Sequence, residues 1–162
     1  MVAIMEGAFV NVKNRSKTIT AEIVVPDSGA NGTLVSQGGR FGGWSLYVKD
    51  GVPAYDYNFL GLQRTTIAAS NKLAPGKAEL RFQFDYDGGG KANGGLGTLF
   101  VNGEKVGEGR IPMTQPSMFS GDETADIGID LGTPVVEAIG SESRSRFTGR
   151  IPKLTVSVQD PK

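Results

Sequence analysis

The chain has 162 residues, enough for one domain with a proper hydrophobic core, and its seventeen basic residues balance seventeen acidic ones. No long run of either sign appears, which disfavours a nucleic acid or a membrane surface as the partner. Cysteine and histidine are both absent, and this excludes disulfides, thiolate nucleophiles, a Ser-His-Asp triad and histidine-ligated metals.

The first ten residues do not resemble a signal peptide, because Glu6 lies where the apolar core would be and no small-residue cleavage site follows. No apolar run approaches the ~20 residues of a membrane helix. These features predict a soluble protein or an excised domain. They leave the compartment open between cytoplasm and periplasm.

Apolar and polar residues alternate along the chain, in the runs 18–25, 44–49, 55–59, 78–87 and 154–158. A period of two places successive side chains on opposite faces of a strand, so each run is predicted to have one dry and one wet face. Roughly eleven or twelve such strands are expected along the chain.

Turn signals separate the runs. The pairs Asp50-Gly51 and Asn102-Gly103 tolerate positive φ in tight hairpins. Helical periodicity is weak throughout, and only 133–143 has room for one helical turn. Many short strands without helices must pack sheet on sheet, because each strand has only one apolar face. We therefore predict a single all-β domain over 1–162, a two-sheet antiparallel sandwich of jelly-roll type.

The stretch QGGRFGGWSLYVKDG, residues 37–51, contains four glycines around Arg40 and Phe41. A phosphate-binding loop would lead into a helix N-terminus, whereas these glycines lead into a predicted strand. Tight bends and close backbone packing are the favoured interpretation. In the remaining one, Arg40 and Phe41 protrude from the bend towards a partner.

Aromatic residues invite a sugar-stacking interpretation. Trp44 alternates with apolar residues, so it is predicted to face the core, and the same holds for Tyr55 and Tyr57. Tyr47 alternates with polar residues instead. We predict that it is the exposed aromatic of this region.

Two acidic groups are candidates for metal binding or catalysis. The loop 85–95 contains Asp85 and Asp87 but lacks the further ligands of a calcium loop, so a mobile hairpin loop and no metal site are predicted. A second group lacks the alternating spacing of a carboxylate-based glycanase, and we predict solvated carboxylates, some of which tie down a loop. Its members are Asp122, Glu123, Asp126 and Asp130.

Four long segments together resemble the C-terminal region of bacterial arylsulfatases, in the same order: GTLVSQGGRFGGWSLYVKDG, YDYNFLGLQR, LRFQFDYDGGG and GTLFVNGEKVGEGRIPMTQPSMFSGDETADIGIDLGTPV. The resemblance extends from about Gly7 to Val158. It implies a concanavalin A-like or laminin G-like sandwich that follows an α/β catalytic domain.

The catalytic apparatus of that family does not carry over. Its enzymes convert a Cys or Ser in a C/S-x-P-S-R motif to formylglycine beside a divalent metal. The nearest segment here, 114–118 (TQPSM), has neither the convertible residue nor the arginine. The resemblance therefore implies a chain without enzymatic activity or cofactor.

In the full enzymes this region packs beside the catalytic domain, so its expected role is to shape a sulfate-ester pocket or to mediate subunit contacts. The expected partner is an arylsulfatase catalytic domain or another subunit, with carbohydrate or a sulfate ester as a possible ligand. The predicted interaction residues are Arg40, Phe41, Tyr47, Asn58, Leu60 and Arg64. The alternative is a free-standing carbohydrate-binding, lectin-like module, which rests on fold analogy.

Overall fold

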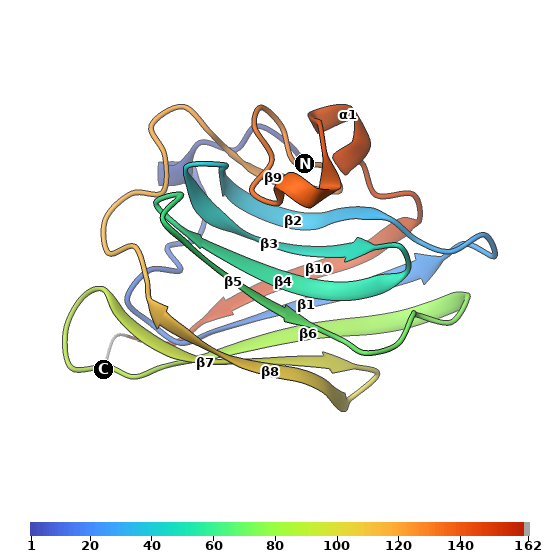
Figure 1. The fold of residues 1–162 in the computed structure, drawn as a ribbon, viewed down its shortest axis with the longest axis horizontal. Coiled ribbons are helices and arrows are strands. Elements are labelled where there is room, and N and C mark those ends of the chain that lie inside the picture. Colours follow the sequence, from blue (N-terminus) through green and yellow to red (C-terminus); the bar gives the residue numbers. More distant parts are fainter. Residues whose placement is uncertain (161–162) are drawn as a thin grey trace.

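The computed structural model describes residues 1–160 and shows two antiparallel five-stranded sheets packed face to face (Figure 1). The strand order is β10-β1-β6-β7-β8 in the first sheet and β5-β4-β3-β2-β9 in the second. This confirms the predicted all-β sandwich. The strands are β1 (Lys17–Val25), β2 (Gly32–Gly39), β3 (Gly42–Lys49), β4 (Val52–Phe59), β5 (Gln63–Ala68), β6 (Gly76–Tyr86), β7 (Asn93–Val101), β8 (Glu104–Met113), β9 (Ala125–Ile127) and β10 (Arg150–Val158).

Helical structure is limited to short pieces. These are the 3-10 turns η1 (Glu6–Ala8) and η2 (Glu137–Ile139) and the helix α1 (Glu142–Ser145). The helical turn predicted within 133–143 is thus confirmed. Within residues 1–160, no helix is long and apolar enough to cross a membrane.

The core lies between the sheets, where the predicted dry faces meet. Trp44 on β3 and Tyr55 on β4 are fully buried, and Phe82 on β6 packs on them from the first sheet. The ring centroids of Tyr55 and Phe82 are 3.6 Å apart, and those of Trp44 and Tyr55 are 6.1 Å apart. This aromatic stack joins the two sheets and confirms that Trp44 faces the core.

The hairpin turns follow the predicted chemistry. Asp50 and Asn102 have φ values of 50°, and the glycines after them have φ values of 82°. Two successive positive φ angles are the mark of the type I′ turn that suits twisted hairpins. The glycine bend of 37–51 is a β2–β3 hairpin in which a Cβ on Gly43 would overlap the carbonyl oxygen of Gln37. Close backbone packing therefore explains this glycine.

The outer face of the second sheet is covered by a cover segment, residues 128–147, which lies over β2 and β3 at the top of Figure 1. Tyr47 points to this face and is only 5% exposed, packed with Ala54 and Val136. The prediction that Tyr47 is exposed is therefore wrong. Alternation distinguishes two faces of a strand, but it does not reveal that an irregular segment buries the second face.

A lysine lies in the core beside the aromatic stack. Lys17 is 4% exposed, and its Nζ is 4.8 Å from the centroid of the Trp44 ring and 5.8 Å from that of Phe84. No carboxylate within residues 1–160 forms an ion pair with it. Burial lowers the pKa of Lys17 to about 7, and the nearby charge of Lys13 adds to the shift.

Candidate functional site

Five of the six predicted interaction residues meet at one place, which we call the turn corner. It consists of the β2–β3 turn (residues 40–41), the β4–β5 turn (residues 60–62) and the flanking side chains of Asn58 and Arg64. Tyr47 is the exception, because it lies beneath the cover segment.

Hydrogen bonds fix the two turns to each other. Asn58 Nδ2 donates to the carbonyl oxygen of Arg40 at 2.8 Å, and Asn58 Oδ1 accepts from the backbone N–H of Gly61 at 2.8 Å. Arg64 donates through Nη2 to the same Arg40 carbonyl at 3.0 Å and through Nη1 to the carbonyl of Val135 at 2.9 Å. Asn58 is buried. It therefore positions the corner and does not face solvent.

The charged groups of the corner are also engaged with each other. Arg40 and Arg64 donate to the same carboxylate oxygen of Glu137, at 3.3 Å and 3.4 Å. The Arg40 and Glu137 side chains are about half exposed, so each contact contributes little to stability. The polar atoms that hold the corner together are thus largely satisfied within the chain.

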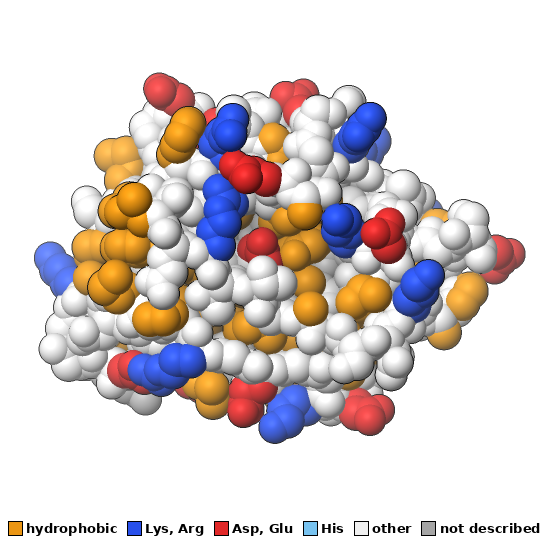
Figure 2. All heavy atoms as spheres, in the orientation of Figure 1, with side chains coloured by type: hydrophobic (Ala, Val, Ile, Leu, Met, Phe, Trp, Pro, Cys, Tyr) orange, Lys and Arg blue, Asp and Glu red, His pale blue; other side chains and the backbone are white. Residues whose placement is uncertain are grey.

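Apolar side chains remain exposed on these fixed turns. Phe41 is 73% exposed, Leu60 43% and Leu62 83%. Leu60 has a φ of 54°, in the left-handed region that costs a residue with a Cβ roughly 1–2 kcal/mol. Figure 2 shows hydrophobic side chains gathered at the left end of the molecule, the end that contains both turns in Figure 1. Exposed apolar side chains on fixed turns are a common feature of interaction surfaces, and this patch is therefore the candidate site.

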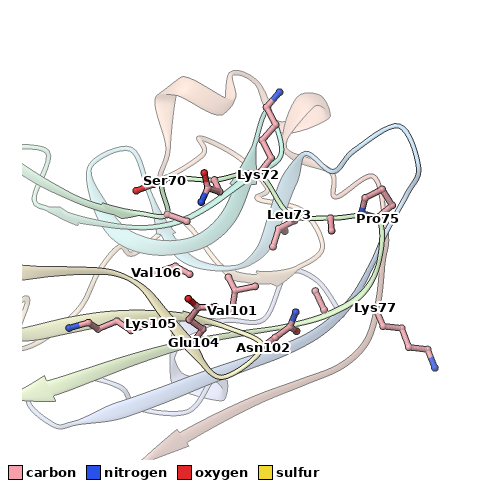
Figure 3. A pocket seen from close by; sticks show the side chains of 14 residues that line it. Ser70, Lys72, Leu73, Pro75, Lys77, Val101, Asn102, Glu104, Lys105 and Val106 are labelled. Atoms are coloured by element: carbon pink, nitrogen blue, oxygen red, sulfur yellow. The ribbon is translucent and has the colours of Figure 1, made fainter.

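A recess of about 440 Å³ opens at the opposite end of the sandwich, between the β5–β6 connection and the β7–β8 turn (Figure 3). We call it the end recess. Leu73, Val101 and Val106 line its inner wall, and Ser70 and Glu104 lie near its rim. Its labelled lysines extend away from the opening. Polar and charged residues make up half of its lining, so the end recess is more polar than a usual small-molecule pocket.

Carboxylates of the acidic group at 122–130 hold loops in place, as the sequence predicts. Asp126 accepts from the backbone N–H groups of Ala3 and Leu131, and Asp130 accepts from that of Val135 at 2.9 Å. Both carboxylates are buried, so the prediction that they are solvated is wrong. The cover segment excludes water from them.

Burial also changes the protonation of one of these groups. It raises the pKa of Asp130 to about 7, and the neighbouring charges of Asp126 and Glu123 add to the shift. Glu123 accepts from the Thr133 hydroxyl, whereas Asp122 is exposed. Glu123, Asp126 and Asp130 therefore serve the packing of loops around β9, whereas the prediction of a solvated carboxylate holds for Asp122.

The carboxylates of the loop 85–95 pair with side chains. Asp87 forms an ion pair with Arg110 on β8, and Asp85 accepts from Gln83 on its own strand. Within residues 1–160, no group of three or more acidic side chains is arranged to hold a metal ion.

Known proteins resemble this chain in structure but not in sequence. No family model matches the sequence, and no curated protein matches it. Among solved structures, the CBM40 domain of a Ruminococcus gnavus sialidase, bound to α2,3-sialyllactose, is 15% identical with a TM-score of 0.61, covering 92% of this chain and 80% of that one.

Two further structures are similar. Domains LG4-5 of the mouse laminin α1 chain are 20% identical with a TM-score of 0.57, over 93% of this chain and 38% of that one. A pentraxin of Limulus polyphemus is 17% identical with a TM-score of 0.55, over 91% of this chain and 71% of that one. These similarities show a lectin-like, laminin G-like sandwich. None of the three is a sulfatase domain.

Proposed function

We propose that this chain is a non-catalytic binding module and that it docks onto another protein domain through the turn corner. The observation that carries this proposal is the exposure of Phe41, Leu60 and Leu62 on two turns that hydrogen bonds hold rigid. Such a surface loses little conformational entropy on binding, and its aromatic anchor gains most from burial in a partner's pocket.

The chemistry of the corner favours a protein partner over a sugar. A sugar needs free donors and acceptors for its hydroxyl groups, whereas the polar groups of Asn58 and Arg64 already bond to the backbone. From the sequence resemblance, we propose that the partner is an arylsulfatase catalytic domain and that the module shapes its sulfate-ester pocket. The identity of this partner rests on that resemblance alone.

The test is the affinity for an arylsulfatase catalytic domain produced as a separate chain, measured by calorimetry. The double change Phe41→Ser/Leu62→Ser should weaken binding by about tenfold or more, because it removes two apolar anchors. The matched control is Leu96→Ser, which removes an exposed leucine from the outer face of β7. The proposal fails if the wild-type chain does not bind, or if the control weakens binding as much as the double change.

Carbohydrate binding is the second candidate, and the fold comparisons favour it more than they favour a sulfatase partner. The CBM40 structure contains a bound sialyllactose, and the end recess offers uncommitted polar groups beside an apolar wall. Among the hydrogen bonds of residues 1–160, none uses the side chains of Ser70, Asn71 or Glu104. These groups are therefore free to bind hydroxyl groups.

Amide chemical-shift mapping with 3′-sialyllactose and with lactose tests this candidate. Shifts should concentrate in 69–78 and 101–106, and the double change Asn71→Ala/Glu104→Gln should reduce them. Shifts confined to the turn corner, or none with either sugar, would exclude the end recess as a carbohydrate site.

A further inference from the structure

The two sheets have four edge strands: β8 and β10 in the first, and β5 and β9 in the second. An edge strand presents unpaired N–H and C=O groups to solvent and can pair with another chain. Proteins therefore protect their edges with charges, prolines, short strands or covering segments. The four edges of this molecule differ in how well they are protected.

Three of the edges are protected. β5 and β8 lie against each other, so closely that a Cβ on Gly107 would meet the carbonyl oxygen of Ala68 at 2.8 Å. β8 also carries four charged side chains along its length. β9 has only three residues, and Ile4 pairs with it through two backbone hydrogen bonds to Ala125, at 2.8 Å and 3.1 Å.

The β10 edge lacks this protection. Within residues 1–160, this nine-residue strand pairs only with β1. Pro152, Lys153 and a register irregularity lie in its first half, whereas residues 154–158, LTVSV, contain neither charge nor proline. Leu154, Val156 and Val158 pack on the core but remain partly exposed. A strand added here would satisfy the open backbone groups and bury these side chains further.

We propose that the β10 edge binds the β10 edge of a second copy of this chain, antiparallel about a two-fold axis at Val156. The axis places Leu154 of each copy opposite Val158 of the other, and Thr155 of each copy opposite Ser157 of the other. These are apolar pairs and hydroxyl pairs, both favourable across antiparallel strands. Two five-stranded sheets would then form one continuous sheet.

The sequence of the edge favours a second copy in this register. The segment 154–158 is nearly palindromic in residue type, so it is complementary to itself. Lys153 falls opposite the uncharged Gln159, so no like charges oppose each other within 153–159. An axis at Leu154 would instead place Pro152, which has no N–H, opposite Val156. The β10 edge and the turn corner are separate surfaces, so this inference does not depend on the proposed function.

Sedimentation velocity over a wide range of protein concentration tests the pairing. The wild-type chain should show a monomer–dimer equilibrium. Thr155 and Ser157 are exposed, and their partners on β1 are Thr20 and Thr18, so a charge introduced at either position has no charge directly opposite it within the monomer. The nearest charges on this face, Lys153 and its partner Glu22, act on both variants alike. The proposed register makes Thr155 and Ser157 opposite neighbours across the dimer.

Two double variants, which differ only in the sign of the charge introduced at residue 157, then test whether Thr155 and Ser157 are opposite each other in the dimer. Thr155→Lys/Ser157→Lys opposes lysine to lysine and should raise the dimer dissociation constant by about tenfold or more. Thr155→Lys/Ser157→Glu opposes lysine to glutamate and should keep the dimer within about threefold of wild type. The control Ser70→Lys/Asn71→Lys adds the same charge on the β5–β6 connection and should leave the dimer unchanged.

Three results would overturn the proposal. A wild-type chain that stays monomeric at every concentration shows that the edge is unpaired. Equal behaviour of the two β10 double variants shows that Thr155 and Ser157 are not opposite each other. A dimer that is lost on Phe41→Ser/Leu62→Ser, and not on Thr155→Lys/Ser157→Lys, assigns the contact to the turn corner.

Discussion

The two faces of the second sheet are both buried, but by different means. The inner face is closed by the aromatic stack of Trp44, Tyr55 and Phe82, and by apolar contacts with the first sheet. The outer face is closed by the irregular cover segment, which lies over hydroxyl groups and carboxylates. Buried polar atoms without a hydrogen-bond partner within residues 1–160 occur on both faces, Tyr55 Oη and Gln37 Nε2 inside and Thr33 Oγ1 and Ser45 Oγ outside.

The difference teaches that burial alone does not measure stabilisation. Apolar contacts on the inner face gain free energy with each side chain removed from water. A buried polar atom without a partner costs about 1–3 kcal/mol instead. The cover segment packs on only a small apolar cluster, whereas the large one lies between the sheets, so we infer that the cover segment has a lower opening free energy than the core. Both faces also contain groups whose charge opposes their own burial, Lys17 inside and Asp130 and Asp56 outside.

The largest expected effect is the pH dependence due to Lys17 on the inner face. Its pKa falls from 10.5 to about 7 on folding, so the unfolded chain binds more protons between these values. Raising the pH from 7 to 10 should therefore increase the free energy of unfolding, by about 4 kcal/mol. Urea denaturation across this pH range measures the slope.

The variant Lys17→Met provides the control. Methionine keeps much of the length of the side chain and removes the titrating group, so the rise with pH should vanish and the variant should be more stable than wild type at pH 7. Only a small decline near pH 10 should remain, because burial raises the pKa of Tyr47, Tyr55 and Tyr57. If Lys17→Met retains the slope, another group causes it and the lysine is not responsible.

The outer face should respond to pH in the opposite direction. The pKa of Asp130 rises from 3.8 to about 7 on folding, so the folded chain binds more protons between these values. Raising the pH from 4 to 7 should therefore lower the free energy of unfolding, by about 3 kcal/mol. Asp130→Asn should remove most of this decline, as thermal melts at several pH values would show, and Asp56, whose pKa burial also raises, accounts for the rest. A decline of undiminished size in the variant contradicts the assignment to Asp130.

A backbone substitution tests the close packing at the β2–β3 hairpin. Gly43→Val should cost about 1–3 kcal/mol, because its Cβ would overlap the carbonyl oxygen of Gln37. Gly121→Val is the matched control, since no atom lies within 4 Å of its Cβ position. Denaturant midpoints of both variants give the comparison, and equal losses would show that the hairpin tolerates a side chain.

The smallest effect is expected at the exposed rim of the outer face. Arg40→Ala should cost less than about 1 kcal/mol, because its ion pair with Glu137 is largely exposed. Asn58→Ala should cost more, since it breaks buried hydrogen bonds to both turns. If chemical denaturation gives Arg40→Ala the larger loss, the arginine is a structural tie and the corner is held differently.

The sequence predicts the inner face well and the outer face poorly, for one physical reason. Alternation assigns Trp44 and Tyr55 to the core because their face is continuously apolar. Tyr47 has Ser45 and Lys49 as neighbours on its face, so the same rule predicts exposure. The cover segment that buries Tyr47 has no periodic pattern and meets β2 and β3 only after folding. Lys17 was missed for a similar reason, since a charged residue at a strand start is usually solvated.

The candidate site was predictable only in part. The glycine bend drew attention to Arg40 and Phe41, and the structure brings Leu60 and Arg64 beside them. Leu62 was missed, although Leu60-Gly61-Leu62 places two large apolar residues in a tight turn, a signal that was available. The end recess and the β10 edge depend on how the strands are ordered in each sheet. Local patterns contain no information on that order.

The strand order also affects how the protein is made. β1 lies between β6 and β10, so the first strand of the chain gains its second neighbour from the last strand. During synthesis, β1 must therefore wait with an open edge until residues 150–158 have left the ribosome. Such long-range pairing slows folding and prolongs the exposure of apolar strands. A nascent chain that stalls before residue 150 thus presents β1, rather than β10, to other chains.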